Sequence, residues 1–300
     1  MTLINHDSHR LERRLVLSLA LTGLILVAEV AGGLLTGSLA LLSDAAHILL
    51  DILALAMSYA ALRLASRPPD DRHTYGFHRL QVLAALANGT TLVLVAFGIF
   101  REAWVRFHRP APVLAGPMLA VAVIGLAVNL AVALVLREHD HHDLNVRSAF
   151  LHVLGDALSS VGVIAAGLVI LLTGWTLADP IVSVLIGLII LAGSGRVLRE
   201  SLHILVEGVP EGATASQVGA VMGQAPGVSE VHDLHIWTVS PGYAALSAHV
   251  VLADQSLAQA QRVQTELKKV LAEQFGIEHT TIQFECANCG QGTLTCANGS

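Results

Sequence analysis

The chain has 300 residues, of which 54% are hydrophobic and only 13% are charged. This charged share is about half of that in soluble globular proteins, and a mean hydropathy of +0.65 excludes an ordinary soluble domain. The formal net charge is −6, and the sequence contains no basic groove interleaved with aromatic residues. These features argue against a nucleic-acid partner.

Six apolar segments are long enough to cross a lipid bilayer, whose core of about 30 Å requires about 20 helical residues. They cover residues 13–35, 39–62, 80–101, 113–136, 148–173 and 178–198. The first segment follows several arginines, as in a signal peptide, but it is too long for one, so we expect a retained helix. The sequence therefore predicts an α-helical membrane domain with six transmembrane helices.

The arginines are distributed unevenly between the two sides of this predicted domain. Three lie on the side opposite the N-terminus, Arg101, Arg106 and Arg109. On the side of the N-terminus lie Arg10, Arg13, Arg14, Arg63, Arg67, Arg72, Arg79, Arg137, Arg147, Arg196 and Arg199. Cytoplasmic loops are enriched in basic residues, so both termini are predicted to be cytoplasmic.

The pattern changes after about Glu207 to that of a small α+β domain. A short helix is predicted at 218–225, strands at 232–239 and 243–252, a helix at 256–275 with Ser256 as its N-cap, and a third strand at 279–285. This order favours a ferredoxin-like or metallochaperone-like arrangement, with helices on one face of a mixed sheet. We expect a transmembrane domain at 1–205, a cytosolic domain at 206–290 and a disordered tail at 291–300.

Two histidine–aspartate pairs occur inside the predicted membrane helices. His47 and Asp51 are four residues apart on the second helix, and His152 and Asp156 are four residues apart on the fifth. This spacing places each pair on one face of its helix. Ionisable residues at membrane depth are costly, so a functional role is the default interpretation. Two imidazoles and two carboxylates are suitable ligands for Zn²⁺.

Other polar residues near these pairs have more than one interpretation. Asp44 lies one turn before His47 and can be a relay or entry ligand for the site; the alternative is a capping or helix-pairing role. Glu29 lies mid-span on the first helix, where a partner on a neighbouring helix or a water-filled cavity fits better than metal ligation. Asp179 precedes Pro180 at the start of the sixth helix and is predicted to cap that helix.

Further candidate ligands lie outside the membrane. His139, His141 and His142 form a loop that can either pass metal towards the entrance or simply be solvated. In the cytosolic domain we consider a zinc site formed by His232, His249, Glu285, Cys286 and Cys289. A Cys-x-x-Cys pair can supply two thiolates; the alternative is that these are ordinary strand and tail residues with reduced cysteines.

Several stretches together resemble the cation diffusion facilitator family, in its zinc-exporting branch. They are EVAGGLLTGSLALLSDAAHILLD from Glu29, TYGFHRLQVLAALAN from Thr74, NVRSAFLHVLGDALSSVGV from Asn145, ADPIVSVLIG from Ala178, ESLHILVEGVP from Glu200 and HDLHIW from His232. The resemblance extends from Val27 to about Glu285. One departure is Gln81, where the family usually has Glu.

The resemblance implies a homodimer that exchanges external protons for cytoplasmic metal. It implies that His47, Asp51, His152 and Asp156 form the transport site and that His232 and His249 belong to a regulatory zinc site. Zn²⁺ is then the transported substrate and a structural or regulatory ion, and no prosthetic group is expected. We expect an integral protein of the bacterial inner membrane, with Zn²⁺, protons and lipid as its partners.

Elementary energetics agree with proton-coupled export. Moving Zn²⁺ outward against 100 mV costs about 4.6 kcal/mol, and histidine binds metal only when neutral, so metal and protons compete for it. The sequence has neither an ATP-binding GxxxxGK[ST] motif nor the HExxH of zinc proteases, so we expect a transporter and not an enzyme. The alternatives are a broader preference including Cd, Co, Ni or Fe, and a membrane metal sensor or channel.

Overall fold

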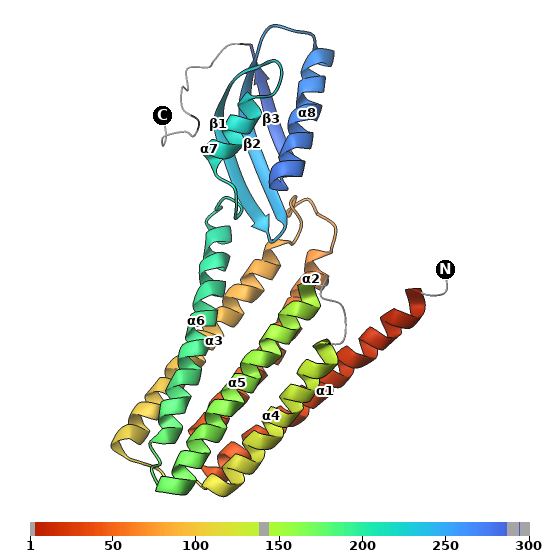
Figure 1. The fold of residues 1–300 in the computed structure, drawn as a ribbon. Coiled ribbons are helices and arrows are strands. Elements are labelled where there is room, and N and C mark those ends of the chain that lie inside the picture. Colours follow the sequence, from red (N-terminus) through yellow and green to blue (C-terminus); the bar gives the residue numbers. More distant parts are fainter. Residues whose placement is uncertain (1–3, 138–143, 287–293, 295–300) are drawn as a thin grey trace. The chain divides into compact units, whose positions relative to one another are not determined.

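A computed structural model gives the fold of the chain (Figure 1). It describes the backbone of residues 4–137, 144–286 and 294, and the side chains of residues 20–134, 154–286 and 294. Close backbone contacts divide the chain into two compact units, residues 1–56 with 88–196 and residues 57–87 with 197–300. Each unit is described by itself.

Six long helices form where the apolar segments predict them. They are α1 (Ile4–Thr36), α2 (Leu39–Ala65), α3 (Arg79–His108), α4 (Ala115–Arg137), α5 (Leu144–Thr173) and α6 (Ala178–Leu205). Helices α2 to α6 each contain a stretch long and apolar enough to span a membrane, and α1 contributes the shorter described apolar stretch Ala20–Thr36. The predicted helical membrane domain is therefore confirmed.

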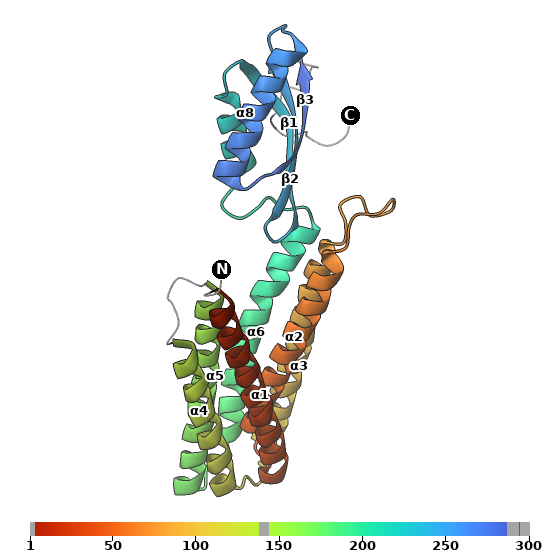
Figure 2. The same ribbon diagram turned by 90° about the vertical axis from the view of Figure 1, so that its right-hand side faces the viewer.

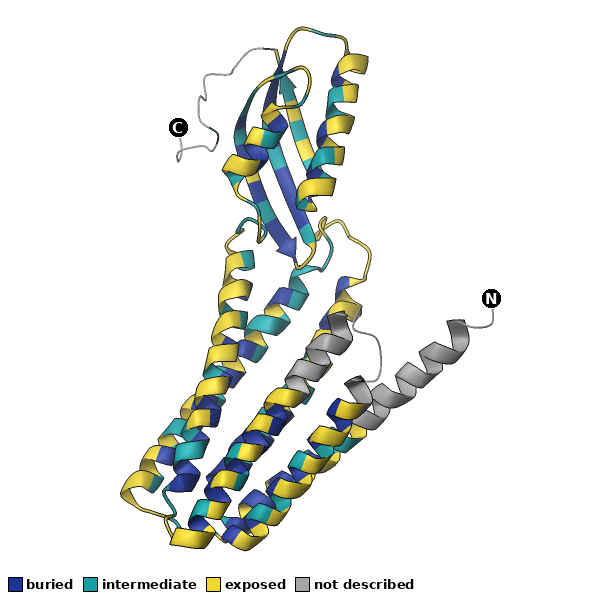
Figure 3. Cartoon of the chain, in the orientation of Figure 1, coloured by how far each residue is buried: buried dark blue, intermediate teal, exposed yellow. Residues whose placement is uncertain are grey.

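The apolar surface of these helices is consistent with a lipid environment. Leu35, Leu94 and Leu172 are 78%, 66% and 80% exposed, and Figure 3 shows many exposed positions along the described parts of the long helices. A soluble protein rarely exposes many large apolar side chains together in this way. In a bilayer the same side chains face hydrocarbon, and the buried ones pack the helices together.

The core of the first unit combines small and large apolar residues from five helices. Ala40 and Leu41 of α2 pack with Ala96 of α3, Met118 of α4 and Val163 of α5. Helix α4 runs beside α5 and also contacts α1, as seen in Figure 2. Small side chains permit the close approach of helices that packing inside a membrane requires.

A tight turn joins α1 to α2. Gly37 has a φ of 72°, a left-handed conformation that glycine adopts without a steric penalty. A Cβ at this position would also lie only 2.9 Å from the backbone oxygen of Pro112. The turn therefore requires glycine for both conformation and space, and it fixes where α2 begins.

The second unit contains a three-stranded sheet covered by two helices. Its elements are α7 (Ala215–Gly223), β1 (Val228–Ser240), β2 (Tyr243–Leu252), α8 (Leu257–Phe275) and β3 (His279–Glu285). Strand β2 is central, antiparallel to β1 and parallel to β3. The parallel pair requires a crossover, which α8 provides. Helices α7 and α8 lie on one face of the sheet (Figure 2), which confirms the predicted α+β arrangement.

Local sequence signals set the ends of α8. Ser256 precedes the helix in an extended conformation, and its backbone amide donates a 2.9 Å hydrogen bond to the side chain of Gln259. Gly276 ends the helix with a φ of 65°, which is a common helix stop. The predicted N-cap is confirmed. Leu267 and Leu271 then face the sheet and are fully buried with Leu246 and Val250.

Candidate functional site

Helices α2 and α5 bring three of the four predicted transport-site residues together. The Nε2 atom of His47 lies 3.6 Å from Oδ2 of Asp51 and 3.9 Å from Oδ1 of Asp156. One donor atom from each of the three residues lies within 4.8 Å of the other two. His152 lies one turn before Asp156 on α5, and its side chain is outside the described residues.

The spacing of these donors fits a metal ion. Nitrogen and oxygen ligands lie about 2.0–2.2 Å from Zn²⁺, so neighbouring donors of a tetrahedral site lie roughly 3.4 Å apart. The observed separations of 3.6 and 3.9 Å require only small side-chain adjustments to reach this geometry. The side chains of His47, Asp51 and Asp156 are 20%, 24% and 11% exposed, so the site is partly enclosed and still accessible.

Two fully buried carboxylates lie near the three donors. Asp44 and Glu29 are each 1% exposed, and both interact electrostatically with Asp156. The carboxylate of Glu29 lies against Gly125 of α4, where a Cβ would be 3.0 Å from Oε1. Glycine thus leaves the space in which the Glu29 carboxylate lies. The expectation that Glu29 has a partner on a neighbouring helix or lies in a water-filled cavity stays a prediction, as does the relay role of Asp44.

The prediction for Asp179 was wrong about which helix it caps. Asp179 lies inside the first turn of α6 and is 0% exposed. Its carboxylate accepts hydrogen bonds from the Ser38 hydroxyl at 2.6 Å and from the backbone amides of Leu39 and Ala40 at 2.7 and 3.1 Å. These amides are the unpaired donors at the start of α2. Asp179 therefore caps the helix that carries His47 and Asp51.

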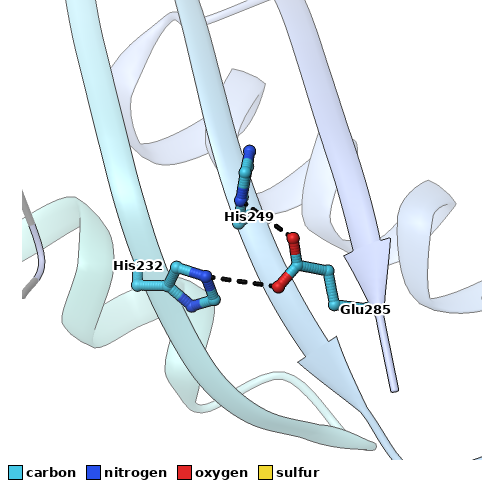
Figure 4. Close-up of side chains that lie close together, drawn as sticks. All are labelled: His232, His249 and Glu285. Carbon is cyan, nitrogen blue, oxygen red and sulfur yellow. Dashed lines mark ion pairs between the residues drawn. The ribbon is translucent and has the colours of Figure 1, made fainter. Parts of the chain in front are cut away.

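A second cluster of donors lies in the sheet of the second unit, which was predicted to be cytosolic (Figure 4). His232 of β1 and His249 of β2 are direct cross-strand neighbours, and Glu285 ends the adjacent β3. The carboxylate of Glu285 lies 3.3 Å from Nε2 of His232 and 3.0 Å from Nδ1 of His249. One donor atom from each residue lies within 4.8 Å of the others, so the three also fit a metal ion.

The residues around this cluster have different roles. The side-chain amide of Gln283 donates a 2.9 Å hydrogen bond to Oε1 of Glu285, so Gln283 holds a candidate ligand in place. Cys286 is exposed and is not among the three clustered donors. Cys289 lies outside the described residues, as do His139, His141 and His142 and most of the tail at 291–300.

Two domains of one known protein family match the two parts of the chain. The cation efflux transmembrane domain matches residues 15–206, and the cation efflux protein cytoplasmic domain matches residues 210–287. The chain belongs to the cation efflux family. Its members are the cation diffusion facilitators that the sequence motifs resemble, so the expected family, and an integral membrane protein of that family, are confirmed.

Several relatives of this family are similar over nearly their full length. The metal cation efflux system protein CzcD of Cupriavidus metallidurans is 45% identical over 93% of this chain and 88% of its own. The zinc transporter ZitB of Escherichia coli is 41% identical over 92% and 88%. The cadmium, cobalt and zinc/H(+)-K(+) antiporter of Bacillus subtilis is 38% identical over 94% and 91%. A solved metal-bound C-terminal domain of the CzcD transporter is 42% identical, covers 24% of this chain and 99% of that domain, and has a TM-score of 0.22.

One group near the cytosolic cluster was not predicted from the sequence. Asp233 lies beside both His235 and His249, at 2.9 and 3.6 Å from their Nε2 atoms. The HDLHIW stretch contains this residue, but strand alternation directs it away from His232. Only the pairing of β1 with β2 shows that it reaches the cluster.

Proposed function

We propose that this cation efflux protein exports Zn²⁺ from the cytoplasm in exchange for protons, by alternating access to one site. The observation that carries the proposal is the convergence of His47 and Asp51 of α2 with Asp156 of α5 inside apolar helices. We assign His152 as the fourth ligand, because it completes two imidazoles and two carboxylates. The resulting site carries the transported ion, and the chemistry is ion exchange without an enzymatic step.

The exchange follows from the chemistry of the ligands. An imidazole that holds a proton on both nitrogens has no lone pair for Zn²⁺, so binding metal releases protons. When the site faces the cytoplasm, Zn²⁺ displaces protons from His47 and its neighbours. When it faces the other side, protons displace Zn²⁺. Related proteins named as a zinc transporter and as a zinc/H(+)-K(+) antiporter support this assignment.

Asp44 is suited to pass ions to or from the site. It is buried one turn before His47 and interacts electrostatically with Asp156. We therefore propose Asp44 as a relay at the entrance, with the histidine loop His139, His141 and His142 as a transient metal-binding segment leading to it.

The cytosolic domain provides a second, regulatory metal site in this proposal. His232, His249 and Glu285 hold Zn²⁺, and Cys286 and Cys289 are proposed as additional thiolate ligands. The cytosolic match is to a domain of cation efflux proteins described as cytoplasmic, so we place both termini in the cytoplasm and the helices in the bacterial inner membrane. We also propose a homodimer in which residues 206–290 pair and residues 1–205 transport.

The main alternative within the same class is a broader set of metals. The Bacillus subtilis relative is named for cadmium, cobalt and zinc, and the donors of the membrane site do not by themselves exclude Cd²⁺ or Co²⁺. A metal sensor or a passive channel is a less suitable interpretation, since neither requires an enclosed donor cluster at membrane depth.

Transport in proteoliposomes tests the proposal. The purified chain is reconstituted, Zn²⁺ movement is followed with a trapped fluorescent indicator, and the pH gradient is set, removed or reversed. Zn²⁺ movement driven by the proton gradient, with matching proton movement in the opposite direction, is the expected result. Zn²⁺ flux that is the same with and without the pH gradient, and that occurs without proton movement, would contradict exchange. Competition by Cd²⁺ or Co²⁺ measures how strongly the site prefers Zn²⁺ over other metals.

A further inference from the structure

Strand β1 contains one extra residue where it runs beside His249. His232 pairs with His249 and His235 pairs with Ser247, so three steps along β1 match two steps along β2. This is a β-bulge. Asp233, inside the bulge, has a φ of 48°, a left-handed conformation that is uncommon for residues other than glycine. Asp and Asn are the residues that adopt this conformation most readily after glycine, so the bulge accommodates Asp233 without a large steric penalty.

The bulge changes which side chains face the metal cluster. In a regular strand, His232 and Leu234 would share one face of the sheet. Leu234 instead packs in the apolar core with Ala248 and Val250, whereas the His232 ring contacts His249 with 5.3 Å between ring centres. The extra residue therefore places the candidate ligand His232 and the core residue Leu234 on opposite faces of the sheet, although they are only two positions apart.

The carboxylate of Asp233 lies between two imidazoles. Its Oδ1 atom is 2.9 Å from Nε2 of His235, and its Oδ2 atom is 3.6 Å from Nε2 of His249. The other ring nitrogen of His249, Nδ1, lies 3.0 Å from Glu285, on the side of the metal cluster in Figure 4. A His249 that binds metal through Nδ1 therefore directs its Nε2–H towards Asp233.

We propose that Asp233 is a positioning residue of the cytosolic metal site, acting on His249 without binding the metal itself. This inference rests on the proposed cytosolic site. A carboxylate beside the remote nitrogen of a ligating histidine fixes its tautomer and ring orientation and increases its basicity. At 3.6 Å the contact with His249 is an electrostatic one and not a hydrogen bond, so the negative charge of Asp233 is what stabilises the metal-bound imidazole. His235 holds the other oxygen of the carboxylate in place.

Zn²⁺ affinity of the full chain tests the proposal. Asp51→Ala and Asp156→Ala remove the membrane site, so chelator competition in detergent then reports the cytosolic site. Asp233→Asn keeps the size of the side chain, and Asn tolerates left-handed backbone, so the variant is expected to fold. It should bind Zn²⁺ about 10–100-fold more weakly. Asp254→Asn, which changes an exposed carboxylate of the same domain, should leave the affinity unchanged.

One further variant separates the charge of Asp233 from its backbone conformation, and one further measurement separates positioning from ligation. Asp233→Gly removes the carboxylate and places at this position the residue that adopts the left-handed conformation most easily. It should weaken Zn²⁺ binding as much as Asp233→Asn does. At saturating Co²⁺, the absorption bands of Asp233→Asn should keep the shape and intensity of the parent, because the ligands are the same. Changed bands would make Asp233 a ligand and overturn the positioning role.

The outcomes distinguish this inference from the proposed site. Equal Zn²⁺ affinity of Asp233→Asn and the parent, with loss of binding in His232→Ala, overturns the role of Asp233 and leaves the site standing. The other outcome is that His232→Ala, added to the chain without the membrane site, leaves Zn²⁺ binding unchanged. In that case the cytosolic site and the role of Asp233 both fail.

Discussion

The Nε2 atom of His47 on α2 lies 3.9 Å from Oδ1 of Asp156 on α5. Two helices that are distant in sequence thus place a nitrogen and an oxygen donor where one metal ion can bind both. His47 also lies 3.6 Å from Asp51 on its own helix. Because the site depends on both helices, a change in their separation would alter metal binding directly.

Replacing Asp51 or Asp156 by alanine is expected to abolish Zn²⁺–proton exchange while the protein still inserts and assembles. Each change removes one oxygen ligand, and the loss of metal affinity should exceed about 100-fold, since even residues behind the ligands cost 10–100-fold. Proteoliposome flux and Zn²⁺ titration measure the effect. Asp71→Ala, which alters an exposed carboxylate, is the matched control. Substantial exchange by either purified site variant would refute the assignment.

Replacing His47 by aspartate is expected to change metal selection. The site becomes richer in oxygen, and carboxylate ligands are better suited to Mn²⁺ than imidazole is. Competition between Zn²⁺, Cd²⁺ and Mn²⁺ in the same proteoliposomes should show a relative gain for Mn²⁺ or Cd²⁺ over Zn²⁺. An unchanged metal profile in this variant would show that ligand identity does not determine selection.

Much of the membrane site could be predicted from the sequence because its signal is local. The four-residue spacing of His47 and Asp51 places both on one helix face, and the apolar runs around them identify the helices. The strands and helix of the cytosolic domain follow from alternation and from caps such as Ser256. These signals depend on neighbours along the chain, so tertiary contacts do not override them.

The remaining features depend on contacts between distant segments. Asp179 caps α2 instead of its own helix because the start of α2 packs beside it, which no local pattern encodes. Asp233 reaches His249 only because β1 carries an extra residue, and a bulge becomes visible only when two strands are paired. Sequence periodicity predicted the elements but not these two relationships.

Zinc binding to the cytosolic site is expected to stabilise the chain and to tune transport. In a chain with Asp51→Ala and Asp156→Ala, Zn²⁺ at about 100 times its dissociation constant should add about 2.7 kcal/mol to the free energy of unfolding. His232→Ala with His249→Ala should remove this effect, which thermal unfolding with and without Zn²⁺ measures. With the membrane site intact, the same double variant should keep residual exchange and lose sensitivity to metal. Complete loss of exchange in the folded double variant would show that the cytosolic site is an obligatory part of the path.

The cysteines give a separate test of the ligands at this site. Cys286 is exposed, so alkylation of its thiol should be readily measured by mass spectrometry. If Cys286 and Cys289 are ligands as proposed, Zn²⁺ should slow alkylation of both, because a metal-bound thiolate is not free to react. Equal alkylation rates with and without Zn²⁺, under conditions where His232 and His249 bind the metal, would limit the site to the three clustered donors.

Removing the Asp179 carboxylate is expected to destabilise the membrane domain strongly. The side chain is 0% exposed, accepts hydrogen bonds from Ser38, Leu39 and Ala40, and lies 3.4 Å from Arg106. Asp179→Ala leaves the buried amides at the start of α2 without an acceptor and leaves a guanidinium without this partner. Arg106 keeps its 3.2 Å ion pair with Glu102, so the main cost is that of the buried amides left without an acceptor. Each such group costs about 1–3 kcal/mol, so the apparent melting temperature in detergent should fall clearly.

Graded variants separate the capping role of Asp179 from its charge. Ser38→Ala removes one hydrogen bond to the carboxylate and the hydrogen bond that the hydroxyl accepts from the Leu41 amide. Loss of such a cap costs about 0.5–2 kcal/mol, less than the loss of Asp179. Asp179→Asn retains an oxygen that can accept from one amide but no longer balances Arg106, so its melting temperature should lie between those of the parent and Asp179→Ala. Adding Arg106→Gln to Asp179→Asn should cost less than the two separate effects combined, because the first change has already removed the ion pair between Asp179 and Arg106. Full additivity would show that Asp179 and Arg106 are not coupled. A parent-like melting temperature for Asp179→Ala would show that the carboxylate does not stabilise the start of α2.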